Sequence, residues 1–319
     1  MNAAPEPRPR LPLSVIGGFL GAGKTTLLNR LLGTSKGRRI AVLVNDFGAI
    51  NIDAELVAAS AGDTIALTNG CVCCSIGDDL TAALIRVIEA PEPFDAIVIE
   101  ASGVSDPWRI AQVALADPAL GLDGVTVLVD ASACLAHAAD PLLADSLRRQ
   151  IEAADLLVVN KSDLVDGSEL QRVQAWLESL AGATPRFLTQ HGDVPLALLT
   201  SAALLAPGHR RPHEHEHPAD HGALFDTWSS HPGEPLSAAA LRALLREMPA
   251  GVLRLKGIVR TDEHGWAELQ FAGRHGSLRS ALAAPAAGAA VVAIGMHRGL
   301  PVQALEHALG SGTVQETTW

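Results

Sequence analysis

The stretch G-F-L-G-A-G-K-T, residues 18–25, decides the fold of this chain. It fits the pattern G-x-x-x-x-G-K-[ST] of a phosphate-binding loop. An apolar, β-branched run at residues 13–16 precedes it, and a leucine-rich run at residues 26–32 follows it. These runs predict a buried strand and a helix, which is the context that the motif requires. We therefore expect a nucleoside triphosphate site here rather than a purely structural turn.

The residues of this loop are expected to hold the phosphates and their metal ion. Backbone N–H groups of a glycine-containing loop turn toward an anion, and the start of the helix adds the positive end of its dipole. Lys24 is expected to reach the β/γ-phosphates and to act in catalysis, and the Thr25 hydroxyl is expected to hold Mg²⁺. The nucleotide-binding assignments in this segment are Gly18, Gly21, Ala22, Gly23, Lys24, Thr25 and Thr26.

Composition and charge restrict the class of protein. With 319 residues, 48% of them hydrophobic, the chain can form one large domain and a smaller one. A net charge of -11 is a poor match for nucleic acid or an anionic membrane, so we expect neither partner. Residues 1–11 are expected to be a disordered tail, and the Pro/Arg-rich segment 1–12 has no apolar core, so we do not expect a signal peptide. No apolar run is long enough to span a bilayer.

Apolar runs of strand length alternate with helical stretches in the first two thirds of the chain. Besides residues 13–16, the expected strands are 39–45, 64–67, 94–100, 124–130 and 155–160, with a helix at 78–89. This pattern indicates an α/β fold, a parallel sheet with helices on both faces. We predict a P-loop NTPase domain over residues 12–206, with its ligand at the carboxyl ends of the strands.

The rest of the chain changes character at residue 207. Residues 207–221 have the composition of a linker, and we expect only weak metal binding by His213, His215, His217 and His221. Residues 222–319 are expected to form a smaller α+β domain. Its predicted strands are 224–230, 252–260, 266–271 and 290–295, and its predicted helices are 236–248 and 301–309.

An N-K-S-D segment, residues 160–163, ends one of the apolar strands. N-K-x-D at such a place is the guanine-reading motif of GTPases. The aspartate accepts from guanine N1–H and the 2-amino group, and adenine offers no such pair of donors. We assign Asn160, Lys161 and Asp163 to guanine binding, against the alternative of a loop carboxylate without a role.

Three acidic residues are candidates for holding Mg²⁺ or for assisting hydrolysis at the γ-phosphate. Glu100 ends a strand in E-A-S-G, where a carboxylate can hold the Mg²⁺ shell through water, and Gly103 can offer its N–H to the γ-phosphate. Asp46 and Asp53 lie in the loop after the second strand. We assign Asp46 and Glu100, together with Lys24, as catalytic. An ordinary strand-end acid is the competing interpretation for Glu100.

The distinctive feature is C-V-C-C, residues 71–74. Thiolates of Cys71, Cys73 and Cys74 can converge on one soft or borderline cation, and Zn²⁺ takes such ligands tetrahedrally. Three protein ligands leave a fourth position open, which suits transfer better than storage. Buried structural cysteines and redox sensing are the alternatives. Crowded thiols favour a reducing, cytoplasmic location over a disulfide framework. We expect the isolated Cys134 to lie in the core.

On these motifs the chain resembles the CobW-type metal-handling GTPases, which are related to the UreG and HypB metal-insertion GTPases. The resemblance covers nearly the whole chain and implies GTP hydrolysis coupled to metal delivery to a client metalloprotein. The metal in that family is most often zinc, with Co²⁺ or Fe²⁺ in some branches. One segment departs from the family pattern N-E-F-G-E. This chain has the shorter Asp46 in place of the first glutamate and Ala49 in place of the second. The matching segments are residues 17–26, 44–53, 69–74, 100–107, 160–163, 253–257 and 291–295.

The hypothesis from sequence is therefore a GTPase metallochaperone that uses GTP, Mg²⁺ and Zn²⁺. The alternatives are a regulatory GTPase with redox-sensing cysteines, a zinc buffer with a vestigial nucleotide site, and a cobalt or iron insertion GTPase. The sequence leaves open whether copies of the chain form a homo-oligomer.

Overall fold

The computed structural model describes residues 10–35, 38–44, 64–66, 78–103, 105–200, 225–281, 284–285 and 288–317. The chain divides into two units, one of Arg10–Thr200 and one whose described part begins at Phe225. Residues 207–221, predicted as a linker, lie outside the described part, as do residues 1–9 of the predicted tail. Leu11, which the sequence assigned to that tail, is already the first residue of a strand.

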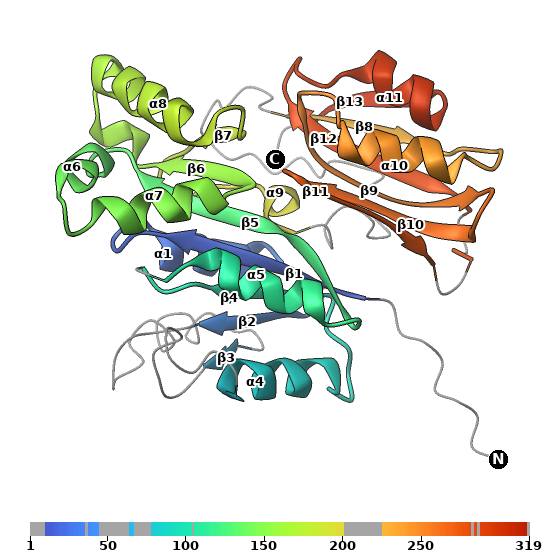
Figure 1. The fold of residues 1–319 in the computed structure, drawn as a ribbon, viewed down its shortest axis with the longest axis horizontal. Helices are drawn as coiled ribbons and strands as arrows, with labels where there is room; N and C mark the ends of the chain where they lie inside the picture. The colour runs from blue at the N-terminus through green and yellow to red at the C-terminus, as the bar shows by residue number, and fades with distance from the viewer. Residues whose placement is uncertain are drawn as a thin grey trace. The chain divides into compact units, whose positions relative to one another are not determined.

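The first unit contains a seven-stranded parallel sheet in the order β3-β2-β4-β1-β5-β6-β7 (Figure 1). Every residue of β2 and β4 is buried, so their apolar runs reflect a sheet covered on both faces. The predicted α/β fold is confirmed. The strands are β1 Leu11–Gly18, β2 Ile40–Val44, β3 Thr64–Ala66, β4 Ala96–Glu100, β5 Leu120–Asp130, β6 Leu156–Asn160 and β7 Arg186–Leu188.

Helices pack on both faces of this sheet. The helices α4, α5, α6, α7 and α8 share a core with the strands, whereas α1 packs on the opposite face through Leu27, Leu28, Leu31 and Leu32 (Figure 1). The helical elements are α1 Lys24–Thr34, α4 Asp78–Ile88, α5 Pro107–Ala116, α6 Cys134–Ala139, α7 Ala144–Ala153, α8 Gly167–Ala181, α9 Leu196–Leu199 and the 3₁₀ turn Ser162–Leu164.

Strand β5 starts four residues earlier than residue 124, where the sequence predicted it to begin. The added residues include Asp123, and a charge inside a buried strand is costly unless it has a partner. In the structure Asp123 is fully buried and accepts a hydrogen bond from the Thr200 hydroxyl at 3.0 Å. A partner 77 residues away therefore allows the carboxylate inside the strand.

The second unit contains a six-stranded antiparallel sheet in the order β11-β10-β9-β12-β8-β13. Helices α10 and α11 pack on it around Trp228, which is fully buried. This arrangement confirms the predicted α+β class. Its elements are β8 Phe225–Ser230, α10 Ala238–Arg246, β9 Val252–Thr261, β10 Gly265–Ala272, β11 His275–Ser280, β12 Ala290–Met296, α11 Val302–Leu309 and β13 Gly312–Thr317.

None of the helices that the structure describes is both long enough and apolar enough to cross a membrane.

Candidate nucleotide-binding site

The phosphate-binding loop connects β1 to α1, as the motif predicted. Gly18, Gly21 and Gly23 have positive φ angles of 140°, 77° and 103°. A Cβ atom on Gly23 would lie 2.4 Å from the amide nitrogen of Asn160, so no larger residue fits there without displacement. The chain can therefore turn directly into α1 and leave the first N–H groups of that helix available to an anion.

Lys24 is the first residue of α1, and only 7% of it is exposed. Its ammonium donates hydrogen bonds to the carbonyl oxygens of Gly18 at 3.0 Å and Phe19 at 3.3 Å. It also lies 3.9 Å from a carboxylate oxygen of Glu100. The loop thus holds its cation at the end of β1, where a phosphate would compete with these acceptors for the ammonium.

Glu100 lies at the carboxyl end of β4, and its strand register pairs it with Ile16 of β1. It is 4% exposed, so its negative charge is buried beside the charge of Lys24. Thr25, on the first turn of α1, is half-buried. A hydroxyl and a carboxylate are oxygen donors of the kind that Mg²⁺ prefers, so this donor set fits the ion. Thr26, by contrast, is exposed.

Asn160 ends β6 and connects two loops. Its side-chain nitrogen donates to the carbonyl oxygen of Ala22 at 2.9 Å, and its side-chain oxygen accepts from the N–H of Gly192 at 3.0 Å. Asp163 lies in the 3₁₀ turn that follows, with its side chain exposed. The N-K-S-D motif therefore touches the phosphate-binding loop at one end and presents a carboxylate to solvent at the other.

Lys161 has the left-handed backbone conformation, with φ at 59°. Its ammonium donates to a carboxylate oxygen of Asp130, at the end of β5, over 2.6 Å. Burial raises the pKa of Asp130, but hydrogen bonds from Lys161 and Ser132 outweigh it and hold that pKa below its ordinary value. An ionised Asp130 thus fixes the lysine of the motif in place.

Sequence reasoning missed two parts of the site. Gln150 on α7 is 1% exposed and bonds to the backbone of Gly18, Gly103 and Ser105. A polar residue beside Leu147 and Ile151, on the buried face of α7, was the available signal. The loop after β7 is the second part, and no motif marks it. Its Thr189 carbonyl accepts from the Ser162 hydroxyl at 3.0 Å.

The structure therefore brings the phosphate-binding loop, Glu100, Gly103 and Asn160 together at the carboxyl ends of β1, β4 and β6. Other predicted site residues lie outside the described ranges, so the structure says nothing of them. They are Asp46, Asp53, Cys71, Cys73, Cys74, His213, His215, His217 and His221. Among the residues that the structure does describe, no cluster of three His, Cys, Asp or Glu side chains could hold a metal ion.

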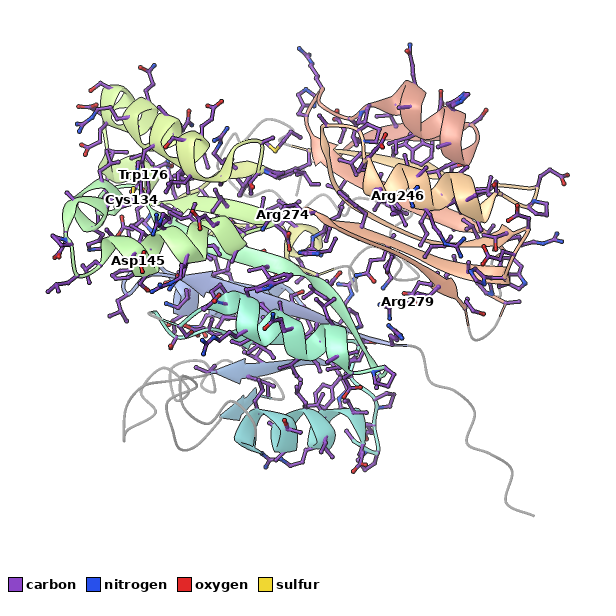
Figure 2. All side chains as sticks on the ribbon, in the orientation of Figure 1. Cys134, Asp145, Trp176, Arg246, Arg274 and Arg279 are labelled. Carbon is purple, nitrogen blue, oxygen red and sulfur yellow. The ribbon has the colours of Figure 1, made fainter. Side chains whose placement is uncertain are left out.

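Cys134 is confirmed as a core residue. It begins α6, is 1% exposed and shares a core with Trp176 of α8 (Figure 2). Burial raises the pKa of its thiol to about 11. The thiol is therefore protonated at neutral pH and is a poor metal ligand or redox group.

Two family models match the chain. Residues 12–187 match the nucleotide-binding domain described as CobW/HypB/UreG, and residues 225–312 match the C-terminal domain of cobalamin synthesis protein cobW. These ranges cover most of the residues of both units.

Individual proteins are similar over much of the chain. The zinc chaperone CobW from a Sinorhizobium species is 33% identical over 296 residues, which span 81% of this chain and 83% of that protein. The zinc chaperone YjiA from Escherichia coli is 34% identical over 198 residues, 59% of this chain and 60% of that one. A crystal structure of Zn(II)-bound YjiA GTPase from E. coli aligns with 94% of this chain and 98% of its own, at 23% identity and a TM-score of 0.47.

Proposed function

The chain belongs to the CobW/HypB/UreG family of nucleotide-binding proteins, and on that premise we propose that it is a GTP-hydrolysing metallochaperone. GTP occupies the loop before α1 and the N-K-S-D motif. Zn²⁺ is the cargo, held by Cys71, Cys73 and Cys74 and passed to a client metalloprotein. Two relatives named as zinc chaperones support zinc over cobalt or iron. Because the thiols must stay reduced, we place this activity in the cytoplasm.

The observation that carries the nucleotide part of this proposal is the bond between Asn160 and Ala22. It joins the motif that reads the base to the loop that binds the phosphates. A nucleoside triphosphate must contact both at once, so a fixed distance between them lowers the entropy lost on binding. Neither a zinc buffer nor a structural turn requires this connection.

The buried cation of Lys24 supports hydrolysis. Together with the N–H groups at the start of α1, it would stabilise negative charge on the phosphoryl group during transfer. Mg²⁺, when bound, neutralises charge on the phosphate oxygens, and Thr25 and Glu100 are the residues that would hold it, Glu100 through water. Gly103 follows Glu100 by three residues and would offer its N–H to the γ-phosphate.

The metal part of the proposal rests on the three thiolates and on the thermodynamic coupling between GTP binding and Zn²⁺ binding. Zn²⁺ prefers sulfur ligands in tetrahedral sites, and three protein ligands leave one position for a group of the client. If GTP changes the affinity for Zn²⁺ by some factor, Zn²⁺ must change the affinity for GTP by the same factor. Hydrolysis can then release or retain the metal by switching between two nucleotide states.

Phosphate release with GTP and with ATP, with and without Mg²⁺, tests the enzymatic part. We expect slow, Mg²⁺-dependent hydrolysis of GTP, little hydrolysis of ATP, and loss of turnover in Lys24→Ala. Arg172→Ala is the matched control, because it removes an exposed cation on α8. Turnover that survives in Lys24→Ala, or equal use of ATP and GTP, would overturn the assignment.

A further inference from the structure

Gln150 lies on the buried face of α7 and contacts two loops of the nucleotide site. Its side-chain oxygen accepts from the N–H of Gly18 at 3.1 Å. Its side-chain nitrogen donates to the carbonyl oxygens of Gly103 at 2.9 Å and Ser105 at 3.2 Å. The partners fix the orientation of the amide, because a backbone N–H can only donate and a carbonyl oxygen can only accept.

The two loops that Gln150 contacts are those expected to surround the γ-phosphate. Gly18 begins the phosphate-binding loop, and its carbonyl oxygen accepts from the ammonium of Lys24. Gly103 lies in the loop that follows Glu100. Its backbone passes so close to the phosphate-binding loop that a Cβ atom there would lie 2.6 Å from a methyl carbon of Leu20. Gln150 therefore connects two segments that already lie in contact.

We propose that Gln150 is a positioning residue for GTP hydrolysis, which holds the loop of Gly103 and Ser105 against the phosphate-binding loop and so sets the preference for GTP over GDP. This inference rests on the proposed function. A loop held in place gives the γ-phosphate a preformed set of contacts, whereas a released loop must be ordered each time GTP binds. GDP lacks the γ-phosphate, so its affinity depends much less on this loop.

Two variants of Gln150 and one control test the hydrogen bonds of its side-chain oxygen and nitrogen. Gln150→Glu keeps the length and an acceptor for the N–H of Gly18, but it removes both donors to the loop after β4. Gln150→Met keeps the length and removes all three bonds. Gln171→Glu makes the same chemical change at an exposed position on α8, so it serves as the matched control. Binding of GDP and of a non-hydrolysable GTP analogue is compared with the turnover number and the melting temperature.

We expect Gln150→Glu and Gln150→Met to lose about tenfold in affinity for the GTP analogue, the scale of one buried polar group left unpaired. Affinity for GDP should fall much less, and the turnover number should fall by about tenfold as well. Gln171→Glu should match the unmodified chain. If both variants fold and have the same ratio of GTP-analogue affinity to GDP affinity and the same turnover number as the unmodified chain, Gln150 contributes only to packing. The inference is then wrong.

Hydrogen exchange on the unmodified chain tests the same inference and does not depend on whether a substituted chain folds. Peptides covering Gly18 and peptides covering Gly103 and Ser105 should gain protection together when the GTP analogue replaces GDP. Equal exchange in both nucleotide states at Gly103 and Ser105 would contradict it. If the unmodified chain hydrolyses GTP but shows no such coupling, only the inference about Gln150 is wrong. If the unmodified chain does not hydrolyse GTP, the proposed function itself is wrong.

Discussion

The side-chain nitrogen of Asn160 donates a hydrogen bond to the carbonyl oxygen of Ala22 over 2.9 Å, although 138 residues separate the two. Both groups are buried, and the oxygen of the same amide accepts from the N–H of Gly192. One side chain at the end of β6 therefore fixes the phosphate-binding loop and the loop after β7 relative to each other. Stability and nucleotide affinity should depend on it together.

Replacement of Asn160 by alanine should lower both the free energy of unfolding and the affinity for GDP. The change leaves the Ala22 carbonyl and the Gly192 N–H without this partner, and an unpaired buried group costs about 1–3 kcal/mol. Urea unfolding and a fluorescent-nucleotide titration measure the two effects. A variant with full stability and full affinity would show that the amide does not hold the loops.

Replacement of Asp163 by asparagine should act on base selectivity and leave stability unchanged. Asp163 is exposed, so its removal costs little in folding. Its carboxylate is the proposed acceptor for two guanine donors, and we expect affinity for GTP to fall about tenfold or more while affinity for ATP does not. Competition between the two nucleotides measures this. A variant that still prefers GTP as strongly as the unmodified chain would exclude Asp163 as the reader of the base.

The ion pair between Asp130 and Lys161 predicts a dependence of stability on pH. The pKa of Asp130 is lower in the folded chain than its ordinary value of 3.8. The contribution of ionised Asp130 to the free energy of unfolding is therefore present above about pH 4. It is lost as the pH falls through the pKa of Asp130 in the folded chain. Asp130→Asn should be less stable than the unmodified chain at pH 7, and the difference should shrink below about pH 4. Urea unfolding from pH 3 to 7 measures it, and a constant difference would contradict the assignment.

Cys134 should resist alkylation while the chain is folded. Its thiol is buried, and a pKa of about 11 leaves almost no thiolate at pH 8. Iodoacetamide followed by mass spectrometry should label Cys71, Cys73 and Cys74 in the metal-free protein, and Zn²⁺ should protect these three. Cys134 should react only after unfolding. Labelling of Cys134 at the rate of the others would show that its site opens readily.

The placement of several candidate nucleotide-site residues could be predicted because they lie at the ends of strands. Glu100 and Asn160 each end a wholly buried apolar strand, and parallel strands bring their carboxyl ends to one edge of the sheet. The contacts of Gln150 could not be predicted, since they join residues 132 and 47 positions apart in the chain without any motif. The roles of Asp46 and of the three clustered cysteines remain predictions from sequence.

Strands with weak sequence patterns were also missed. The run H-G-S-L-R-S of β11 is mostly polar and lies at the edge of its sheet, where it pairs with β10. Strand β7 has three residues, too few for an alternating pattern to show. β13, residues G-T-V-Q-E-T, occupies the other edge of the second sheet and begins with a glycine. Pairing with a formed neighbour, more than local preference, determines such edge strands.

The central claim is that nucleotide state sets the affinity for Zn²⁺ at Cys71, Cys73 and Cys74. The most direct measurement is the Zn²⁺ dissociation constant, obtained by competition with a chelating indicator in the presence of Mg²⁺ and either GDP or a non-hydrolysable GTP analogue. The triple variant Cys71→Ser, Cys73→Ser and Cys74→Ser, with Cys134 intact, serves as the control. The account predicts one tightly bound Zn²⁺ whose affinity differs between the two nucleotides and is lost in the triple variant. Equal affinities with both nucleotides, or the same single Zn²⁺ in the triple variant, would contradict it.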